Sequence, residues 1–130
     1  MNVLMISLDK SLLKKESSVS RRHDLYTREL DGEIHVVLHT AHKGIQKVKQ
    51  GNLVVNPSNS FFKPFFLYDA CKIGREIIKK NDIDLIVTQD PHITGLIGVL
   101  LKKKSKIPLC VHFHADFLDN PYWIKENPIN

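Results

Sequence analysis

The 130-residue sequence has only two cysteines, and it has no apolar run near the roughly 20 residues that a membrane-spanning helix needs. Cys71 falls in a helical pattern and Cys110 in an apolar strand, so we expect two buried, reduced thiols rather than a disulfide. The apolar stretch 3–8 is too short for a signal peptide and follows no basic residue. We therefore expect no export signal and a cytoplasmic protein. Peripheral contact with the inner face of the membrane is compatible with this location.

Several sequence motifs that would point to a particular chemistry are absent. There is no GxGxxG or Walker pattern, no CxxC pair and no Ser/His/Asp elbow. The basic runs are not interleaved with aromatic residues, which argues against nucleic-acid binding. With 42% hydrophobic and 25% charged residues, the composition is that of a globular domain rather than a disordered or membrane protein.

The net charge of +5 favours contact with anions such as nucleotide phosphates or acidic lipids, although a basic solvated surface explains it equally well. The clearest basic groups, Lys79–Lys80 and Lys102–Lys104, close two expected helices. Cations there complement the helix dipole and stay hydrated, which is the favoured interpretation. The functional alternative is peripheral contact with an anionic membrane.

Short apolar runs alternate with helical patterns along the chain, which predicts one α/β domain with a mainly parallel, doubly wound, Rossmann-like sheet in three α/β/α layers. We expect the strand order 3-2-1-4-5, with the switch point between the first and fourth strands. Pro64 opens the second helix, and Gly74 allows that helix to pack closely on the sheet. The expected strands are 2–8, 33–40, 53–55, 84–88 and 109–114, and the expected helices are 20–30, 65–80 and one carrying Ile93, Leu96, Ile97, Leu100 and Leu101.

The carboxyl ends of the last two strands carry polar side chains that strand packing does not require. Ligands of open α/β sheets bind beyond such ends. Gln89, Asp90 and Thr94 lie at a strand-to-helix turn whose free N–H groups favour an anion or hydroxyl, although Asp90 also suits an ordinary helix cap. At the other end, His114 can hydrogen-bond a ligand hydroxyl while Asp116 orients it or caps the next turn, although a histidine there also suits a strand cap without any ligand. We assign these five residues to a substrate site.

The segment from His112 to Asp116 also spells H-x-H-x-D, which is a candidate metal site. Period two places both histidines on one strand face with Asp116 beyond, a spacing that some metal-dependent hydrolases use. Those motifs usually continue with a further histidine, and Phe117 stands there instead. No metal is therefore assigned, and a hydrolase remains the less favoured alternative.

Taken in order, several segments resemble the amino-terminal half of family 4 glycosyltransferases. The most specific are Thr88–Gly98, which reads TQDPHITGLIG, and His114–Phe117, which reads HADF, with Trp123 downstream. The resemblance covers nearly the whole chain and is weakest over residues 41–60. Its other pieces are Val3–Asp9, Arg21–His23, Glu33–Val37 and Ile107–Leu109.

This resemblance implies a GT-B architecture, in which two Rossmann-like domains enclose the active site. The amino-terminal domain mainly holds the acceptor, here a glycan or lipid-linked acceptor, and the carboxyl-terminal domain holds the nucleotide-sugar. The family transfers the sugar with retention and generally needs no metal, so the nucleotide-sugar is a co-substrate and no cofactor is expected. The resemblance places His114 at the reacting centre as the catalytic position. It places the loop after the first strand near the donor phosphates. Ser17, Ser18 and Arg21, which precede the first helix, could take a phosphate or a carboxylate there, although a solvated loop is favoured because no glycine is present.

The sequence departs from the family pattern in two ways. Glycine usually stands in the first loop, where the backbone approaches a phosphate, whereas here the loop reads Lys15–Ser18. Residues 1–130 contain no stretch that resembles the donor-binding domain with its paired glutamates, so we expect them to form one domain, with an interdomain segment beginning at about residue 118. Such a domain should be inactive without its carboxyl-terminal partner. The alternative is a non-catalytic Rossmann-like binding or scaffold domain that pairs with another chain.

Overall fold

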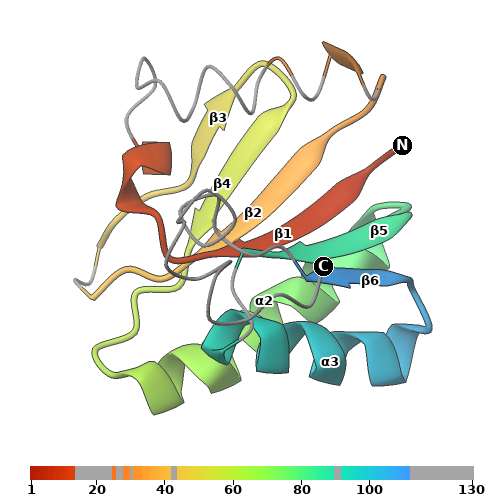
Figure 1. The fold of residues 1–130 in the computed structure, drawn as a ribbon. Coiled ribbons are helices and arrows are strands. Elements are labelled where there is room, and N and C mark those ends of the chain that lie inside the picture. The colour runs from red at the N-terminus through yellow and green to blue at the C-terminus, as the bar shows by residue number, and fades with distance from the viewer. Residues whose placement is uncertain (14–24, 26–27, 30, 42–43, 90–91, 112–130) are drawn as a thin grey trace, which may run out of the picture.

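The computed structural model describes residues 1–13, 25, 28–29, 31–41, 44–89 and 92–111 (Figure 1). Within these residues the chain forms a six-stranded sheet in the order β3-β4-β2-β1-β5-β6. The strands are β1 (Val3–Ser7), β2 (Ile34–Leu38), β3 (Val48–Gln50), β4 (Leu53–Pro57), β5 (Leu85–Thr88) and β6 (Leu109–Val111). The helices are η1 (Lys10–Leu13), α2 (Lys63–Lys80) and α3 (Ile93–Ser105).

The predicted strand order is confirmed. β1 pairs in parallel with β2 on one side and with β5 on the other, while β4 and β6 extend the parallel sheet outward. Every residue of β1 and β2 is buried, as their nearly unbroken apolar sequences require in a sheet covered on both faces. The fold is therefore a mostly parallel, Rossmann-like α/β sheet, and its switch point lies between β1 and β5.

One strand was not predicted. β3 pairs antiparallel with β4 as a hairpin, with Val48 opposite Val55 and Gln50 opposite Leu53. Gly51 has a φ of 58°, a left-handed conformation that the two-residue turn between these strands uses at little cost. The hairpin replaces the helix that usually connects neighbouring parallel strands, so the sheet ends in a short antiparallel edge.

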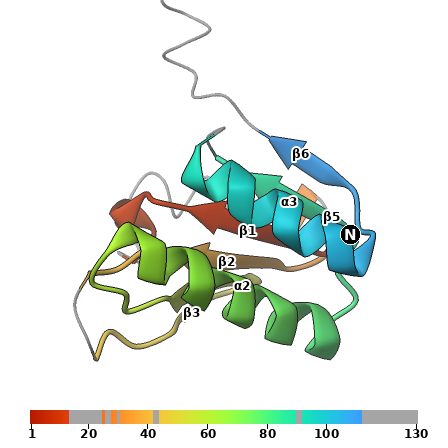
Figure 2. The same ribbon diagram turned by 90° about the horizontal axis from the view of Figure 1, so that it is seen from below.

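The two faces of the sheet build two separate apolar clusters. On one face, β-strand residues such as Leu4, Ile6 and Ile86 pack against α2 and α3, with Phe66 fully buried between them. Figure 2 shows these two helices side by side on that face. On the other face, residues such as Met5 cluster with Leu12 of η1. The helix predicted at residues 20–30 falls mostly outside the described residues.

Gly74 has a different role from the one predicted. A Cβ placed on Gly74 would lie 2.8 Å from Cδ1 of Leu101, so the close contact is with α3 rather than with the sheet. Gly98 of α3 makes the corresponding approach to the sheet, because a Cβ there would lie 2.6 Å from Cγ2 of Thr88. The two glycines thus let α2 pack on α3 and α3 pack on β5.

The prediction for the cysteines is half confirmed. Cys71 is buried in α2, and burial raises the pKa of its thiol. Cys110 is exposed, contrary to prediction. Leu109 packs into the α3 side of the sheet, so the alternation of β6 turns Cys110 to the opposite face, where no described residue covers it. Among the described residues, no helix is long and apolar enough to cross a membrane.

Candidate functional site

The carboxyl ends of β1 and β5 meet at the switch point, and polar side chains join them there. Ser7 ends β1 and is fully buried, and its Oγ donates a hydrogen bond to Oε1 of Gln89 at 2.5 Å. The same Oγ accepts from the backbone N of Asp9 at 3.0 Å. Gln89 follows β5 directly, and its own backbone N donates to the carbonyl of Ile6 at 3.3 Å. These hydrogen bonds therefore hold the starts of the two loops, after β1 and after β5, next to each other.

The other end of the Gln89 amide is also occupied. Its Nε2 donates to Sδ of Met5 at 3.4 Å, so both polar atoms of the side chain contact β1. The structure thus brings Gln89 to the predicted edge and gives its amide a structural partner at each atom. A ligand hydroxyl there would meet a side chain that is already oriented.

We expect the Gln89→Ala variant to lose about 1–3 kcal/mol of unfolding free energy, because the buried Ser7 hydroxyl would lose its acceptor. Gln89→Glu keeps an oxygen that can accept from Ser7, so its loss should be clearly smaller. Urea unfolding followed by circular dichroism measures both. Equal losses for the two variants would show that the Ser7 contact does not stabilise the edge.

A second polar group at this edge has no partner among the described residues. Thr88 ends β5 fully buried, and its Oγ1 has no hydrogen-bond partner there. Thr94 lies in the first turn of α3 and is also fully buried. A buried hydroxyl without a partner costs free energy that a bound water or ligand group would recover. The strand-to-helix connection therefore carries both predicted residues, Gln89 and Thr94, together with Thr88, which was not predicted.

A third polar cluster, absent from the predictions, lies where β2 and β4 end. Thr40 Oγ1 donates to Oδ1 of Asn59 at 3.1 Å and accepts from the backbone N of Asn59 at 2.8 Å. Ser60 Oγ donates to Oδ2 of Asp69 on α2 at 2.7 Å. The only sequence signal is the polar run 56–60 that follows the expected strand 53–55.

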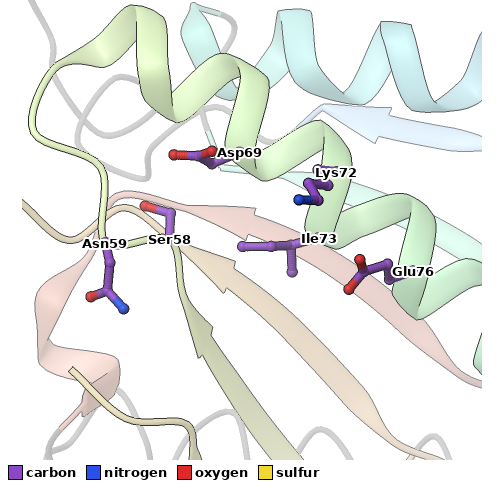
Figure 3. A pocket seen from close by; sticks show the side chains of 6 residues that line it. All are labelled: Ser58, Asn59, Asp69, Lys72, Ile73 and Glu76. Carbon is purple, nitrogen blue, oxygen red and sulfur yellow. The ribbon is translucent and has the colours of Figure 1, made fainter. Parts of the chain in front are cut away.

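Beside this cluster lies an open hollow of about 460 Å³ between the end of β4 and one side of α2 (Figure 3). Its size falls in the range of small-molecule sites, but its lining is polar rather than mainly apolar. Carboxylate, ammonium, amide and hydroxyl groups face it, which suits a ligand rich in hydroxyls. Its lining residues are Ser58, Asn59, Asp69, Lys72, Ile73 and Glu76.

His35 lines a neighbouring hollow of about 310 Å³ farther along α2. Burial lowers the pKa of its imidazole, and the carboxylate of Glu33, with Oε1 3.6 Å from Nε2, partly opposes that shift. Lys47 and Lys49 add to the lowering. At neutral pH the side chain is therefore held mainly in its neutral form.

This lowered pKa predicts a pH-dependent stability. Below the unfolded-state value of 6.5 the unfolded chain binds a proton that folded His35 binds less readily. The contribution is complete above that value and is lost as the pH falls through the folded-state pKa. The unfolding free energy of the wild type should thus decline between pH 7 and 5, with a weaker decline in His35→Gln. An identical decline in the variant would contradict this assignment.

All of the other predicted site residues lie outside the described residues. These are Ser17, Ser18, Arg21, Asp90, His114 and Asp116, together with His112 of the alternative metal site. Their assignments stay predictions. Among the described residues, no three His, Cys, Asp or Glu side chains gather as metal ligands would.

A comparison with curated proteins finds one informative similarity. The chain is 26% identical over 99 residues to the alpha-monoglucosyldiacylglycerol synthase of Streptococcus pneumoniae (strain ATCC BAA-255 / R6). The matched part is 74% of this chain but 22% of that protein, so the chain spans a small part of its relative's length. No protein-family profile and no solved structure matches the chain. The chain is thus a distant, partial homologue of a glycosyltransferase, and its own fold is a mostly parallel α/β sheet.

Proposed function

We propose that this chain is the acceptor-side domain of a retaining GT-B glycosyltransferase, which transfers a sugar from a nucleotide-sugar to a lipid-linked or glycan acceptor. The observation that carries the proposal is the partial match to a synthase of a glucosylated diacylglycerol. The strand order supports it, since the switch point puts the polar ends of β1 and β5 at one edge.

Under this proposal the domain positions an acceptor hydroxyl and closes over the donor sugar. Such a reaction needs orientation of two substrates and stabilisation of separating charge, and it needs no nucleophile from this domain. Gln89 lines the acceptor edge, the buried Thr88 and Thr94 lie behind it in the strand-to-helix connection, and His114 contacts the transferred sugar. A separate donor-binding domain supplies the nucleotide site.

The polar hollow beside α2 supports the acceptor assignment. It opens at the carboxyl ends of the strands, the edge from which the Gln89 connection also leaves. Its hydroxyl and carboxylate groups match the hydrogen-bonding needs of a sugar or glycerol acceptor. Diacylglycerol and short glycans are accordingly the first acceptors to try.

The test uses the full natural polypeptide, with radiolabelled nucleotide-hexoses and diacylglycerol in mixed micelles. We expect one donor to give a labelled monohexosyl lipid. Lys49→Gln on the far antiparallel edge serves as a control that should keep full activity, since its exposed side chain is remote from the switch point. A folded protein that labels neither lipid nor glycan acceptors with any donor would contradict the proposal.

A further inference from the structure

One buried polar side chain interrupts the apolar pattern of β2. The other four residues of this strand are apolar, whereas His35 places an imidazole there, with only 9% of its side chain exposed. Its Nε2 has no hydrogen-bond partner among the described residues, because Oε1 of Glu33 lies 3.6 Å away, too far for a hydrogen bond. A buried polar atom without a partner costs free energy, which a bound ligand group would recover.

The strand beside His35 turns further side chains to the same face of the sheet. Leu53 and Val55 of β4 pack into the cluster on the opposite face. Strand alternation therefore directs Val54 and Asn56 toward the α2 side, and Val54 is the register partner of His35. α2 packs mainly over β1 and β2, and the β3 hairpin stands where a crossover helix would cover this edge. Within the described residues, a partly polar strip of the sheet therefore lies open beside α2.

A hollow of about 310 Å³ lies between this strip and α2. His35 and Asn56 line it from the strands, while Ile73 and Glu76 line it from α2. Figure 3 shows the last two side chains pointing from the helix toward the strands. Both also line the larger hollow at the carboxyl edge, but the smaller hollow continues along α2 toward the end of that helix. Its volume is at the lower end of the range for small-molecule sites.

The side chains around this smaller hollow offer both hydrogen-bond donors and acceptors. Lys47, which precedes β3, and Lys80, at the end of α2, bring two ammonium groups. Two amides are held by the backbone, since Nδ2 of Asn56 donates to a carbonyl of β2 at 3.1 Å and Nδ2 of Asn81 donates to one of α2 at 3.0 Å. Each amide therefore offers a ligand mainly its oxygen, and Glu76 adds a carboxylate.

We propose that this hollow binds a small, water-soluble phosphorylated polyol, such as a sugar phosphate. The two ammonium groups and the imidazole attract the phosphate, while the amide oxygens and the carboxylate accept hydrogen bonds from hydroxyls. A bare phosphate offers mainly acceptor oxygens, so Glu76 would repel it. A neutral sugar would leave both lysines without an anion. The groups that line the hollow thus match a ligand that carries a phosphate and hydroxyls together.

A ligand in this position would connect two parts of the fold. Contacts with Lys47 and Lys80 hold the β3 hairpin against the end of α2, the helix whose other end borders the larger hollow. Because only the folded chain brings these side chains together, the ligand stabilises the folded state. The proposal concerns a site separate from the switch point, and it does not depend on the proposed sugar transfer.

The experiment titrates glucose 6-phosphate, fructose 6-phosphate and sn-glycerol 3-phosphate into the full natural polypeptide by isothermal calorimetry. Glucose and inorganic phosphate serve as the two halves of the ligand. We expect at least one phosphorylated polyol to bind about tenfold or more tightly than either half. Equal affinity for inorganic phosphate, no binding of any of the three, or binding only to phosphatidylglycerol vesicles would overturn the proposal.

Matched variants on α2 locate the site. Lys80→Gln should weaken binding of the phosphorylated polyol about tenfold, because a charge-assisted hydrogen bond to the phosphate is lost. Lys79→Gln removes the same charge from the adjacent exposed residue, which does not line the hollow, and should change the affinity by less than about twofold. Equal losses for the two variants would reduce the effect to net charge and contradict the assignment.

Two further measurements test the role of each half of the site. Glu76→Gln should weaken binding of the phosphorylated polyol severalfold but tighten that of inorganic phosphate, because a repulsive charge is removed. With selectively labelled histidines, the imidazole signals of His35, identified by their loss in His35→Gln, should shift on saturation with the ligand. Binding that leaves these signals unmoved would place the ligand elsewhere and overturn the proposal.

Discussion

The Phe66→Ala variant is expected to lose about 3–5 kcal/mol of unfolding free energy, a large part of the roughly 5–15 kcal/mol that holds a domain folded. Phe66 is fully buried in the cluster that joins α2, α3 and the sheet. Its ring also contacts the edge of His39 at the end of β2, with centroids 4.8 Å apart. Truncation therefore opens a cavity in the core and removes support from the carboxyl edge.

The adjacent Phe65 provides a matched control. It belongs to the same helix and the same residue type but is 58% exposed. Phe65→Ala should change the unfolding free energy by less than about 0.5 kcal/mol. Chemical denaturation of both variants measures the contrast. If the two losses were equal, the orientation of α2 on the sheet would be wrong.

The second large effect is expected at His114. If this side chain contacts the transferred sugar, as the family resemblance implies, His114→Ala should lower kcat roughly 100-fold by removing a positioned hydrogen bond. The unfolding free energy should change little if the role is purely catalytic. Steady-state transfer assays, run with the nucleotide-hexose that labels the lipid acceptor, give kcat, and denaturation gives the unfolding free energy.

His112→Ala separates the transferase from the metal-dependent hydrolase. In the transferase account, this residue touches no substrate, so its loss should leave kcat within a few-fold of the wild type. A metal site would need both histidines, and both variants would then abolish zinc binding and activity together. Stoichiometric zinc in the wild type that disappears in either variant would contradict the transferase account.

The central sheet could be predicted from sequence because its signal is local and strong. β1, β2 and β5 are short apolar runs buried on both faces, which a parallel sheet requires. The strand order followed from the right-handed crossover rule and the position of the helical patterns. These elements place the switch point, and hence the edge at which Gln89 and Thr94 lie.

Features that depend on tertiary pairing were harder to predict. The β3 strand has the sequence Val-Lys-Gln, which carries no strand signal by itself and exists because β4 pairs with it. The polar cluster of Thr40, Asn59 and Asp69 joins three segments that are separate in sequence, so no local sequence pattern predicts it. The helical pattern includes Leu96 and Leu100, yet both side chains are exposed, because periodicity reports apolar positions and not which neighbour covers them.

Sequence reasoning placed Gln89 correctly at the end of a strand, but it did not predict the contacts of its side chain. Gln89 lies where predicted, but its amide contacts Ser7 and Met5, partners that lie more than 80 residues away in sequence. Thr88 was interpreted as part of a strand, and its unpartnered buried hydroxyl became visible only after the strand was placed. The register between parallel strands decides which residues become hydrogen-bond partners, and the sequence alone does not reveal that register.

The most direct measurement of the central claim is the anomeric configuration of the product. The full natural polypeptide would be given an α-linked nucleotide-hexose and diacylglycerol, and the isolated lipid product examined by proton NMR. The account predicts a monohexosyl lipid with the α configuration retained. A β-linked product, or release of free hexose with no glycolipid, would contradict it.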